Sequence, residues 1–438
     1  MKIAFVSQPW DVVRPDDASG SLQVWTKEIK NRISTTAPIL IYSPNWTSRQ
    51  VETISEGNVT YVYVPMRGEA WTKTLGRASG HALKWIGRQN ERFPPFAHTL
   101  QYLGYSSGVG WDLRRRGCDL VHVHNFSQFL PIVRRFNPDI KTVLHMHCEW
   151  LSQLEPGIVA RRLAHTDLVV GCSHHVTKAI RKAHPTYAGQ TATVYNGVDT
   201  ADFPCRPRRS TRTDDASFRI LFVSRISPEK GVHDLLTAFS HLKAVIPNSQ
   251  LTLVGAFGSA PYMYIVGLSQ DPLVSKLKQF YSASANSNDA YRTYIERMVH
   301  DHDLSGITFT GRLSHREVRS FYHGADVLVA PSLSEAFGMS IVEGMASGVP
   351  VVATRTGGIP EIVVDQITGL LVPPGCPDAL ADAILQLYHA PERRERMGQA
   401  GRARAETLFG WSNAVDQLLS AYSAIPNMPQ PVTTHRSY

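Results

Sequence analysis

The chain has few cysteines and no long apolar run. Its five cysteines are widely spaced over 438 residues and form no C-x-x-C pair, so the sequence indicates neither a disulfide framework nor a thiol redox motif. We expect reduced thiols in the core. No stretch approaches the ~20 consecutive apolar residues that span a bilayer. The opening MKIAFVSQPW lacks the apolar length and cleavage site of a signal peptide. These absences predict a cytoplasmic protein.

Charge is modest and unevenly distributed. Residues 1–204 carry 23 Lys and Arg against 16 Asp and Glu, a formal charge of +7, whereas residues 205–438 carry 22 against 21, or +1. Seven of the eight tryptophans also lie in the first half. A basic, indole-rich half suits an anionic or sugar-like acceptor. It is also compatible with a non-catalytic module that binds membrane or nucleic acid, but such a module leaves the acids and cations clustered in the second half unexplained.

Short runs rich in Val, Ile and Leu alternate with helical patterns, which predicts an α/β fold with parallel sheets built from βαβ units. We expect two doubly wound domains at 1–204 and 218–408, a polar linker at 205–217, a helix at 409–424 and a disordered tail at 425–438. The connection 258–290 is long enough for a lid or an acceptor loop. Strands are expected near 2–7, 38–42, 59–64, 119–124, 141–146, 167–171, 192–195, 219–224, 251–255, 307–310, 326–330, 350–353 and 369–372.

Such sheets bind ligands beyond the carboxyl ends of their strands, so motifs that follow strands matter most. The first expected strand lacks the G-x-G-x-x-G turn that a dinucleotide pyrophosphate needs. That absence disfavours a NAD-dependent oxidoreductase.

The densest motif is APSLSEAFGMSIVEGMASGVPVVATRTGGIPEIV, from Ala330 to Val363. A strand leads into a loop with Glu335, and a helix is expected to begin near Phe337 or Gly338. Free N–H groups at a helix start suit a diphosphate. Glu343 then falls in the second helical turn. The two acids could bind sugar and ribose hydroxyls, or they could simply be a capping acid and a solvated helix residue.

A second motif is RILFVSRISPEKG, in which an expected strand leads into Arg225 and Lys230. Two cations five residues apart at a strand-to-helix junction can converge on one diphosphate. They would stabilise the charge that develops as a nucleotide diphosphate departs. Taken alone, they could equally be surface charges.

These segments, together with VYNGVDTADF, resemble the signature motifs of the retaining glycosyltransferases of family four, which have the GT-B fold. The resemblance is strong over about 190–410 and weaker over the first half. It implies two Rossmann-like domains facing across a cleft, an acceptor-binding first domain, a donor-binding second domain, and a C-terminal helix that returns to the first.

Carried over residue by residue, the resemblance assigns the donor diphosphate to Arg225 and Lys230, the transferred sugar to Glu335, and the ribose to Glu343. It implies that Phe337, Gly338 and Met339 present backbone at the donor. The family also has a Gly-rich loop after the first strand, here with Ser19 and Gly20 in place of the usual glycine pair. His124 matches a family histidine that faces the donor sugar or its phosphate.

Two histidine pairs, His122 with His124 and His145 with His147, each have alternate strand positions and therefore share a face. Four imidazoles could hold a metal, but packing or sugar contacts explain them equally well. Since the family is not generally metal-dependent, no metal or other cofactor is expected. His147 and Glu149 are candidates for the acceptor side.

Residues 71–93, WTKTLGRASGHALKWIGRQNERF, separate apolar and basic side chains on a helical wheel. This pattern fits a helix lying on anionic lipid at the inner face of the membrane, or one packed on its own domain. The expected partners are therefore a nucleotide-sugar donor, a glycan or lipid-linked acceptor and anionic membrane, without nucleic acid. The expected reaction retains the anomeric configuration.

Overall fold

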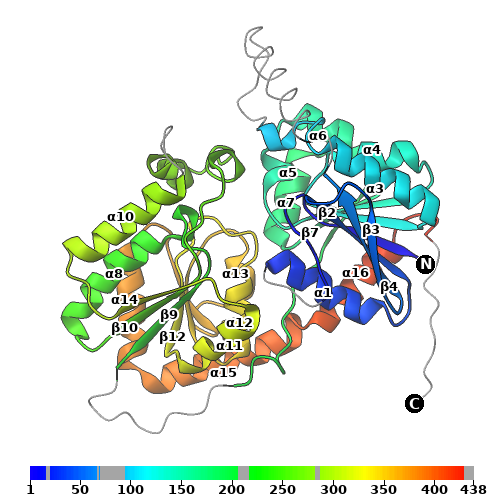
Figure 1. The fold of residues 1–438 in the computed structure, drawn as a ribbon. Helices are drawn as coiled ribbons and strands as arrows, with labels where there is room; N and C mark the ends of the chain where they lie inside the picture. Colours follow the sequence, from blue (N-terminus) through cyan, green and yellow to red (C-terminus); the bar gives the residue numbers. More distant parts are fainter. Residues whose placement is uncertain (16–19, 67–68, 70–93, 206–216, 282–286, 429–438) are drawn as a thin grey trace, which may run out of the picture. The chain divides into compact units, whose positions relative to one another are not determined.

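The computed structural model describes residues 1–15, 20–66, 69, 94–205, 217–281 and 287–428 (Figure 1). The chain forms two compact units. Unit 1 comprises Met1–Tyr195 with Trp411–Tyr438, and unit 2 comprises Asn196–Gly410. The basic segment 71–93, most of the expected linker and Ser19 lie outside the described residues.

Unit 1 is built on an eight-stranded sheet of order β3-β4-β2-β1-β5-β6-β7-β8. Apart from its two edge strands, its strands are largely buried runs of the kind found in sheets covered on both faces. All neighbouring pairs are parallel except β3 with β4. The strands are β1 (Ile3–Val6), β2 (Ile39–Asn45), β3 (Glu52–Glu56), β4 (Val59–Pro65), β5 (Leu120–His124), β6 (Lys141–Met146), β7 (Leu168–Gly171) and β8 (Gln190–Thr193).

Strand β3 was not expected from the sequence. All five of its residues, ETISE, are exposed, so it shows no apolar run or buried face by which sequence reasoning finds strands. It forms an antiparallel edge against β4, with Glu52 opposite Tyr63 and Glu56 opposite Val59. Its charged ends suit an unpaired edge.

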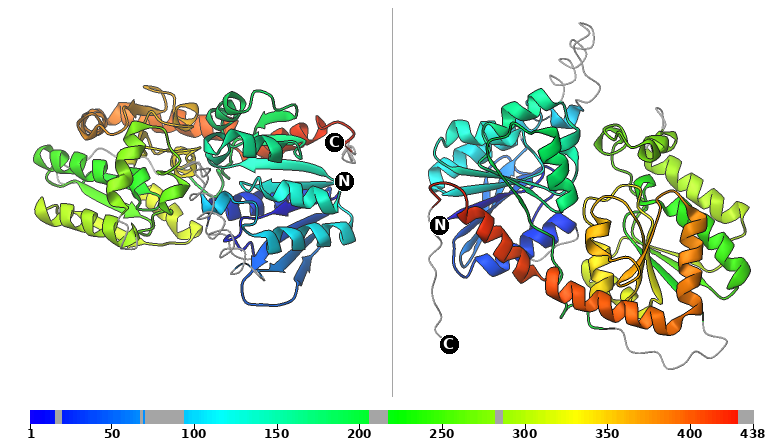
Figure 2. Two further views of the ribbon diagram at one scale, coloured as in Figure 1. Left: turned by 90° about the horizontal axis from the view of Figure 1, so that it is seen from above. Right: turned by 180° about the vertical axis from the view of Figure 1, so that it is seen from behind.

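The helices of unit 1 include one from the C-terminal end of the chain. Helix α16 lies beside α1 (Figure 2), which confirms the expected return of the last helix. Ile425 and Met428, just beyond α16, are buried, so disorder does not begin at 425 as expected. The unit 1 helices are α1 (Ser21–Ile33), η1 (Pro95–Ala97), α3 (Leu103–Arg116), α4 (Phe129–Phe136), α5 (Trp150–Gln153), α6 (Pro156–Leu163), α7 (His174–Ala183) and α16 (Trp411–Ser423).

Unit 2 repeats the doubly wound plan with a fully parallel six-stranded sheet of order β11-β10-β9-β12-β13-β14. Helices cover both of its faces (Figure 1). Its strands are β9 (Arg219–Val223), β10 (Gln250–Val254), β11 (Ile307–Gly311), β12 (Val327–Ala330), β13 (Val351–Thr354) and β14 (Gly369–Val372). Its larger helices are α8 (Val232–Val245), α10 (Ser287–Asp301), α11 (His315–Gly324), α12 (Met339–Ala346), α14 (Pro377–His389) and α15 (Pro391–Leu408).

The connection 258–290 is folded where the structure describes it. It holds η3 (Tyr262–Tyr264), α9 (Pro272–Lys276) and η4 (Leu277–Phe280) before α10 begins. Val266, Leu277 and Phe280 are buried in the core of unit 2. Apolar burial of this kind anchors the described part of the segment and does not support its interpretation as a free lid.

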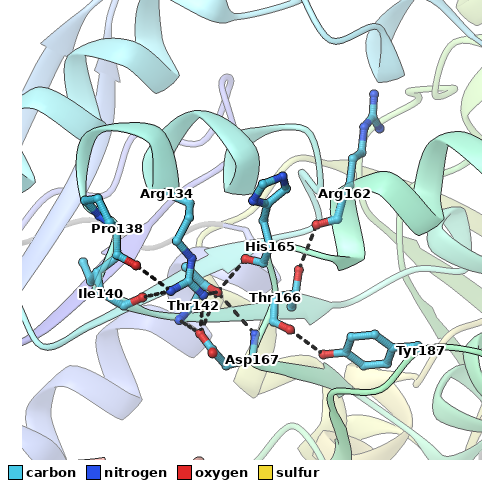
Figure 3. Close-up of polar contacts among 9 residues, drawn as sticks. All are labelled: Arg134, Pro138, Ile140, Thr142, Arg162, His165, Thr166, Asp167 and Tyr187. Atoms are coloured by element: carbon cyan, nitrogen blue, oxygen red, sulfur yellow. Dashed lines mark hydrogen bonds and ion pairs between the residues drawn. The ribbon is translucent and has the colours of Figure 1, made fainter.

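A polar network ties the amino ends of β6 and β7 to α4 in unit 1 (Figure 3). Arg134 of α4 donates to the Asp167 carboxylate at 2.7 Å and to the Ile140 carbonyl at 2.8 Å. The same carboxylate oxygen accepts the Thr142 N–H at 2.7 Å. A surface hollow of about 550 Å³ adjoins Asp167 and Tyr187. It lies at the amino ends of the strands, the edge opposite to the one that parallel sheets use for ligands.

Each sheet reverses its strand order once, which marks a topological switch point. In unit 1 the chain leaves β1 for β2 on one side, while β5 flanks β1 on the other. In unit 2, β10 and β12 flank β9 in the same way. Ligands of doubly wound sheets bind at the carboxyl ends of the strands at such points. The residues that follow β1, β5, β9 and β12 are therefore the place to search for a site.

Two further expectations can be compared with the structure. None of the described helices combines the length and apolar character needed to cross a membrane. The five cysteines are free, and Cys172 is buried as expected, but Cys205 and Cys376 are exposed. The expectation of core thiols is therefore wrong for these two.

Candidate active site

Lys230 and Glu335 form a direct ion pair at the switch point of unit 2. Lys230 ends the short η2 helix (Pro228–Lys230) after β9, and Glu335 lies in the loop after β12. The Lys230 Nζ donates to Glu335 Oε2 at 2.6 Å, and the two side chains are only 15% and 19% exposed. Residues predicted from two separate motifs are thus brought together, 105 positions apart in sequence.

Arg225 lies on the same connection and is held by a residue that sequence reasoning missed. Its Nη2 donates to Glu229 Oε1 at 3.1 Å, and the Ser227 hydroxyl donates to the same oxygen at 2.7 Å. The Glu229 side chain is 1% exposed, whereas that of Arg225 is 51% exposed. A buried carboxylate therefore holds one terminal nitrogen of an exposed guanidinium. Arg225 precedes the η2 helix, so helical spacing gave no signal for this contact.

Glycines pack against the backbone of the Glu335 loop. A Cβ on Gly357 would lie 1.8 Å from the Glu335 carbonyl oxygen, and its φ is +53°. The Gly358 N–H donates to the same oxygen at 3.0 Å. A side chain at Gly357 would displace the backbone that carries the Glu335 carboxylate, so these glycines position that residue.

Helix α12 begins at Met339 with Gly338 as its N-cap, where the sequence placed it. Gly338 has a φ of +116°, in the range that favours glycine. The Phe337 side chain is 2% exposed and packs edge-on against Phe409. It therefore acts as an apolar anchor, while the chain from Gly338 onward offers the first N–H groups of the helix.

The Glu343 side chain is more enclosed than expected for a residue that binds a ribose. Its side chain is 8% exposed. One oxygen pairs with His315 Nε2 at 3.0 Å, and the other accepts the Tyr322 hydroxyl at 2.8 Å. Phe203 packs edge-on against both of these rings. Burial and the nearby Glu343 carboxylate raise the pKa of Tyr322 well above its usual value, so Tyr322 remains a donor. The sequence motif predicted Glu343, but it did not indicate His315 or Tyr322, which hydrogen-bond to it.

Four histidines gather at the switch point of unit 1, against Trp25 of α1 and Tyr422 of α16. His124 ends β5, as predicted, and its Nδ1 lies 3.1 Å from His147 Nε2. His122 contacts the Tyr422 hydroxyl at 2.6 Å and His145 at 3.1 Å. Trp25 lies within 5.7 Å, centroid to centroid, of all four rings.

Burial keeps these imidazoles neutral. It lowers the pKa of His124 to about 3 and places those of His122, His145 and His147 well below their usual value. A neutral imidazole can accept a hydrogen bond. Among the described residues, the buried Nε2 of His124 has no hydrogen-bond partner, so its hydrogen-bonding capacity is unmet in this structure.

The turn after His124 is held in an unusual backbone conformation. Asn125 has a φ of +59°, which is uncommon for a residue other than glycine. Its side-chain oxygen accepts the His147 N–H at 2.7 Å. Asn125 therefore couples the ends of β5 and β6, a role that the sequence did not reveal.

The remaining unit 1 candidates have structural partners. Gly20 is the N-cap of α1, and its N–H donates to Gln23 at 3.0 Å. Glu149 pairs with His175 at 2.5 Å and accepts from Gln153 at 2.8 Å. Among the described residues, His122, His124 and His145 could offer nitrogens to a metal within 4.8 Å of one another. Both nitrogens of His122 already have protein partners.

Comparison with known proteins relates both halves of the chain to glycosyltransferases. The profile of Glycosyl transferases group 1 matches residues 206–404, and that of Glycosyltransferase Family 4 matches residues 59–202. A D-inositol 3-phosphate glycosyltransferase of Segniliparus rotundus is 30% identical over 340 residues, which are 75% of this chain and 66% of the relative. A glycogen synthase of Mycobacterium tuberculosis is 26% identical over 374 residues, or 83% and 78%.

A solved structure shows the same fold. The Anabaena protein HepE, in complex with UDP and glucose, aligns with a TM-score of 0.66 at 19% identity, covering 97% of this chain and 100% of that one. The two family models and the shared fold identify the chain as a GT-B glycosyltransferase. The chain belongs to glycosyltransferase family four, which excludes the oxidoreductase and the non-catalytic module as descriptions of it.

Proposed function

We propose that this glycosyltransferase takes its sugar from a nucleotide-diphosphate donor bound by unit 2. The observation that carries the proposal is the Lys230–Glu335 pair at 2.6 Å, on the loops that flank the switch point. The exposed guanidinium of Arg225 adds a second cation on the connection after β9. Two cations and a helix start are the groups that a diphosphate needs. The UDP in the HepE structure supports this donor class.

Each donor-side residue then has a defined task. Lys230 and Arg225 hold the diphosphate and stabilise the negative charge that grows on it as the glycosidic bond breaks. Glu335 accepts hydrogen bonds from the transferred sugar. Glu343 accepts a ribose hydroxyl on a lone pair left over by His315 and Tyr322, because a carboxylate has about four acceptor positions.

The transfer retains the anomeric configuration by a front-face route. The acceptor oxygen attacks on the face from which the diphosphate leaves, and the leaving phosphate oxygen takes the acceptor proton. Unit 1 binds the acceptor, and the neutral Nε2 of His124 accepts a hydrogen bond from a hydroxyl of the donor sugar. No metal takes part, since fixed cations perform the charge stabilisation that a metal would otherwise supply.

The acceptor is a glycan, a lipid-linked sugar or a small polyol, and the setting is the synthesis of cell-surface polysaccharide or glycoconjugate. The two relatives are named as a glycogen synthase and a D-inositol 3-phosphate glycosyltransferase, which supports this range of acceptors.

The basic segment 71–93 contacts anionic membrane. Binding of the protein to anionic vesicles at low salt tests that contact, and absence of co-sedimentation would refute it.

Donor turnover tests the central proposal. Thermal shift with UDP, GDP and ADP identifies the base, and the matching nucleotide sugars are then assayed for release of the diphosphate with and without EDTA. We expect release that EDTA does not reduce, and a product whose anomeric proton NMR shows retention. Inversion would refute the front-face route, and EDTA sensitivity would refute metal independence. Failure of every nucleotide sugar to turn over would refute the donor class.

A further inference from the structure

Four aromatic rings gather beside the histidines of unit 1. The aromatic cluster consists of Trp10, Phe96, Phe126 and Trp150. Trp10 lies 5.3 Å from Phe126 and 6.4 Å from Trp150 between ring centroids, with interplanar angles of 72° and 74°. Phe96 lies 4.4 Å from Trp150, and Phe126 lies 6.0 Å from it. The three pairs other than Phe96 with Trp150 are edge-to-face, an arrangement that aromatic rings prefer.

Only one ring of the cluster is open to solvent. Phe96, Phe126 and Trp150 are at most 8% exposed, whereas Trp10 is 42% exposed. Phe126 and Trp150 contact Trp10 directly and Phe96 packs against Trp150, so buried rings hold the Trp10 indole while part of its surface remains in water. An apolar surface that is held rigid and left exposed is suited to binding a partner.

The cluster lies at the switch point of unit 1. Trp10 follows β1, Phe126 follows His124 at the end of β5, and Trp150 follows His147 after β6. These three strands are neighbours in the parallel sheet, so their carboxyl ends share one edge. The Phe126 N–H donates to the His124 carbonyl at 2.7 Å, which ties the cluster to the histidine that the proposed reaction uses.

We propose that Trp10 is the stacking surface for a sugar ring of the acceptor. This inference rests on the proposed function, in which unit 1 binds the acceptor. It narrows the acceptor class to saccharides, free or as the head of a larger molecule. The C–H face of a pyranose lies on the indole, and its hydroxyls reach the polar groups around it.

The neighbours of the cluster favour a sugar over a lipid chain. Gln8 and the half-buried Asp11 flank Trp10 and are joined by a 2.9 Å hydrogen bond. Glu149 precedes Trp150 and pairs with His175. Asp11 and Glu149 are partly exposed, and a hydrocarbon chain laid on Trp10 would desolvate them without replacing their water contacts, which is unfavourable. A sugar ring supplies hydroxyls to them.

The test compares acceptor kinetics in Trp10→Ala, Trp10→Phe and Trp111→Ala. Trp111 is the matched control because it is 52% exposed and lies on α3, where it stacks on Arg115. The acceptors are methyl glycosides of glucose, galactose, mannose and N-acetylglucosamine, and oligosaccharides of the maltose series. The donor is the nucleotide sugar that wild type hydrolyses, and transfer is followed by mass spectrometry.

We expect Trp10→Ala to raise the acceptor KM on the order of tenfold, with the donor KM within a factor of two of wild type. Trp10→Phe should recover most of the loss, and Trp111→Ala should match wild type. An acceptor KM within twofold of wild type in Trp10→Ala would overturn the proposal. So would a wild type that hydrolyses its donor but, by saturation-transfer NMR and by turnover, uses none of these saccharides.

Donor hydrolysis separates this proposal from the one on which it rests. A wild type that cleaves no nucleotide sugar refutes the donor assignment to unit 2. A wild type that cleaves the donor while Trp10→Ala behaves as wild type refutes only the stacking surface. Circular dichroism of each variant confirms folding, and Trp10→Phe keeps the test valid if the alanine variant is unstable.

Discussion

The Lys230–Glu335 pair predicts opposite effects on binding and on turnover. In the free protein the Glu335 carboxylate lies 2.6 Å from the Lys230 ammonium, the cation that we propose binds the donor diphosphate. The carboxylate therefore competes with the phosphate oxygens. Glu335→Gln preserves the shape of the side chain and removes its charge, so it should release Lys230 to the ligand.

The expected gain in nucleotide affinity on Glu335→Gln follows from the burial of the Lys230–Glu335 pair. Both side chains are less than one fifth exposed, so their interaction should exceed that of exposed ion pairs, which contribute up to about 1 kcal/mol. A gain of about 1.4 kcal/mol corresponds to tenfold tighter binding of the nucleoside diphosphate. Turnover should fall on the order of a hundredfold, because Glu335 no longer orients the sugar. Lys230→Met should weaken nucleotide binding and turnover together.

Isothermal titration with UDP, GDP or ADP, whichever shifts the melting temperature most, measures the first effect, and diphosphate release measures the second. Glu392→Gln is the control, since Glu392 lies in α15 with its side chain 91% exposed. The reasoning is refuted if Glu335→Gln binds the nucleotide no more tightly than wild type. Unchanged turnover in Lys230→Met would remove that residue from the site.

Three further outcomes test other parts of the site. Tyr322→Phe removes the hydroxyl that holds Glu343 at 2.8 Å, and steady-state kinetics should show the donor KM raised several-fold with a smaller change in kcat; an unchanged KM would contradict this. Gly357→Ala should lower kcat at least tenfold in the same assay because its Cβ would meet the Glu335 carbonyl at 1.8 Å, whereas Gly258→Ala, where nothing lies within 4 Å, should not. The depressed pKa of His124, about 3 against 6.5, means that the unfolded chain binds a proton between these values that the folded protein does not. Stability should therefore fall as pH falls below 6.5, by about 2 kcal/mol from pH 7 to pH 5 for this group. Urea unfolding should show that loss reduced in His124→Gln, and an identical pH dependence in the two proteins would exclude His124 as its source.

Much of the architecture was predictable because parallel strands buried on both faces must be apolar throughout. Runs such as Ile3–Val6 and Val351–Thr354 are fully buried, and their spacing with helical segments predicted two doubly wound units. Strand β3 escaped prediction because its stability comes from pairing with β4, which leaves no hydrophobic pattern in its own residues.

The sequence by itself determined the chemical types at the site and their positions after strands, since the motifs around Lys230, Glu335 and His124 are local. Only the tertiary structure decided their partners. The Lys230–Glu335 pair, the hold of Tyr322 on Glu343 and the support of Trp10 by Trp150 join residues far apart in the chain. Such contacts depend on which strands become neighbours in a sheet, and strand order is set by the packing of the whole unit.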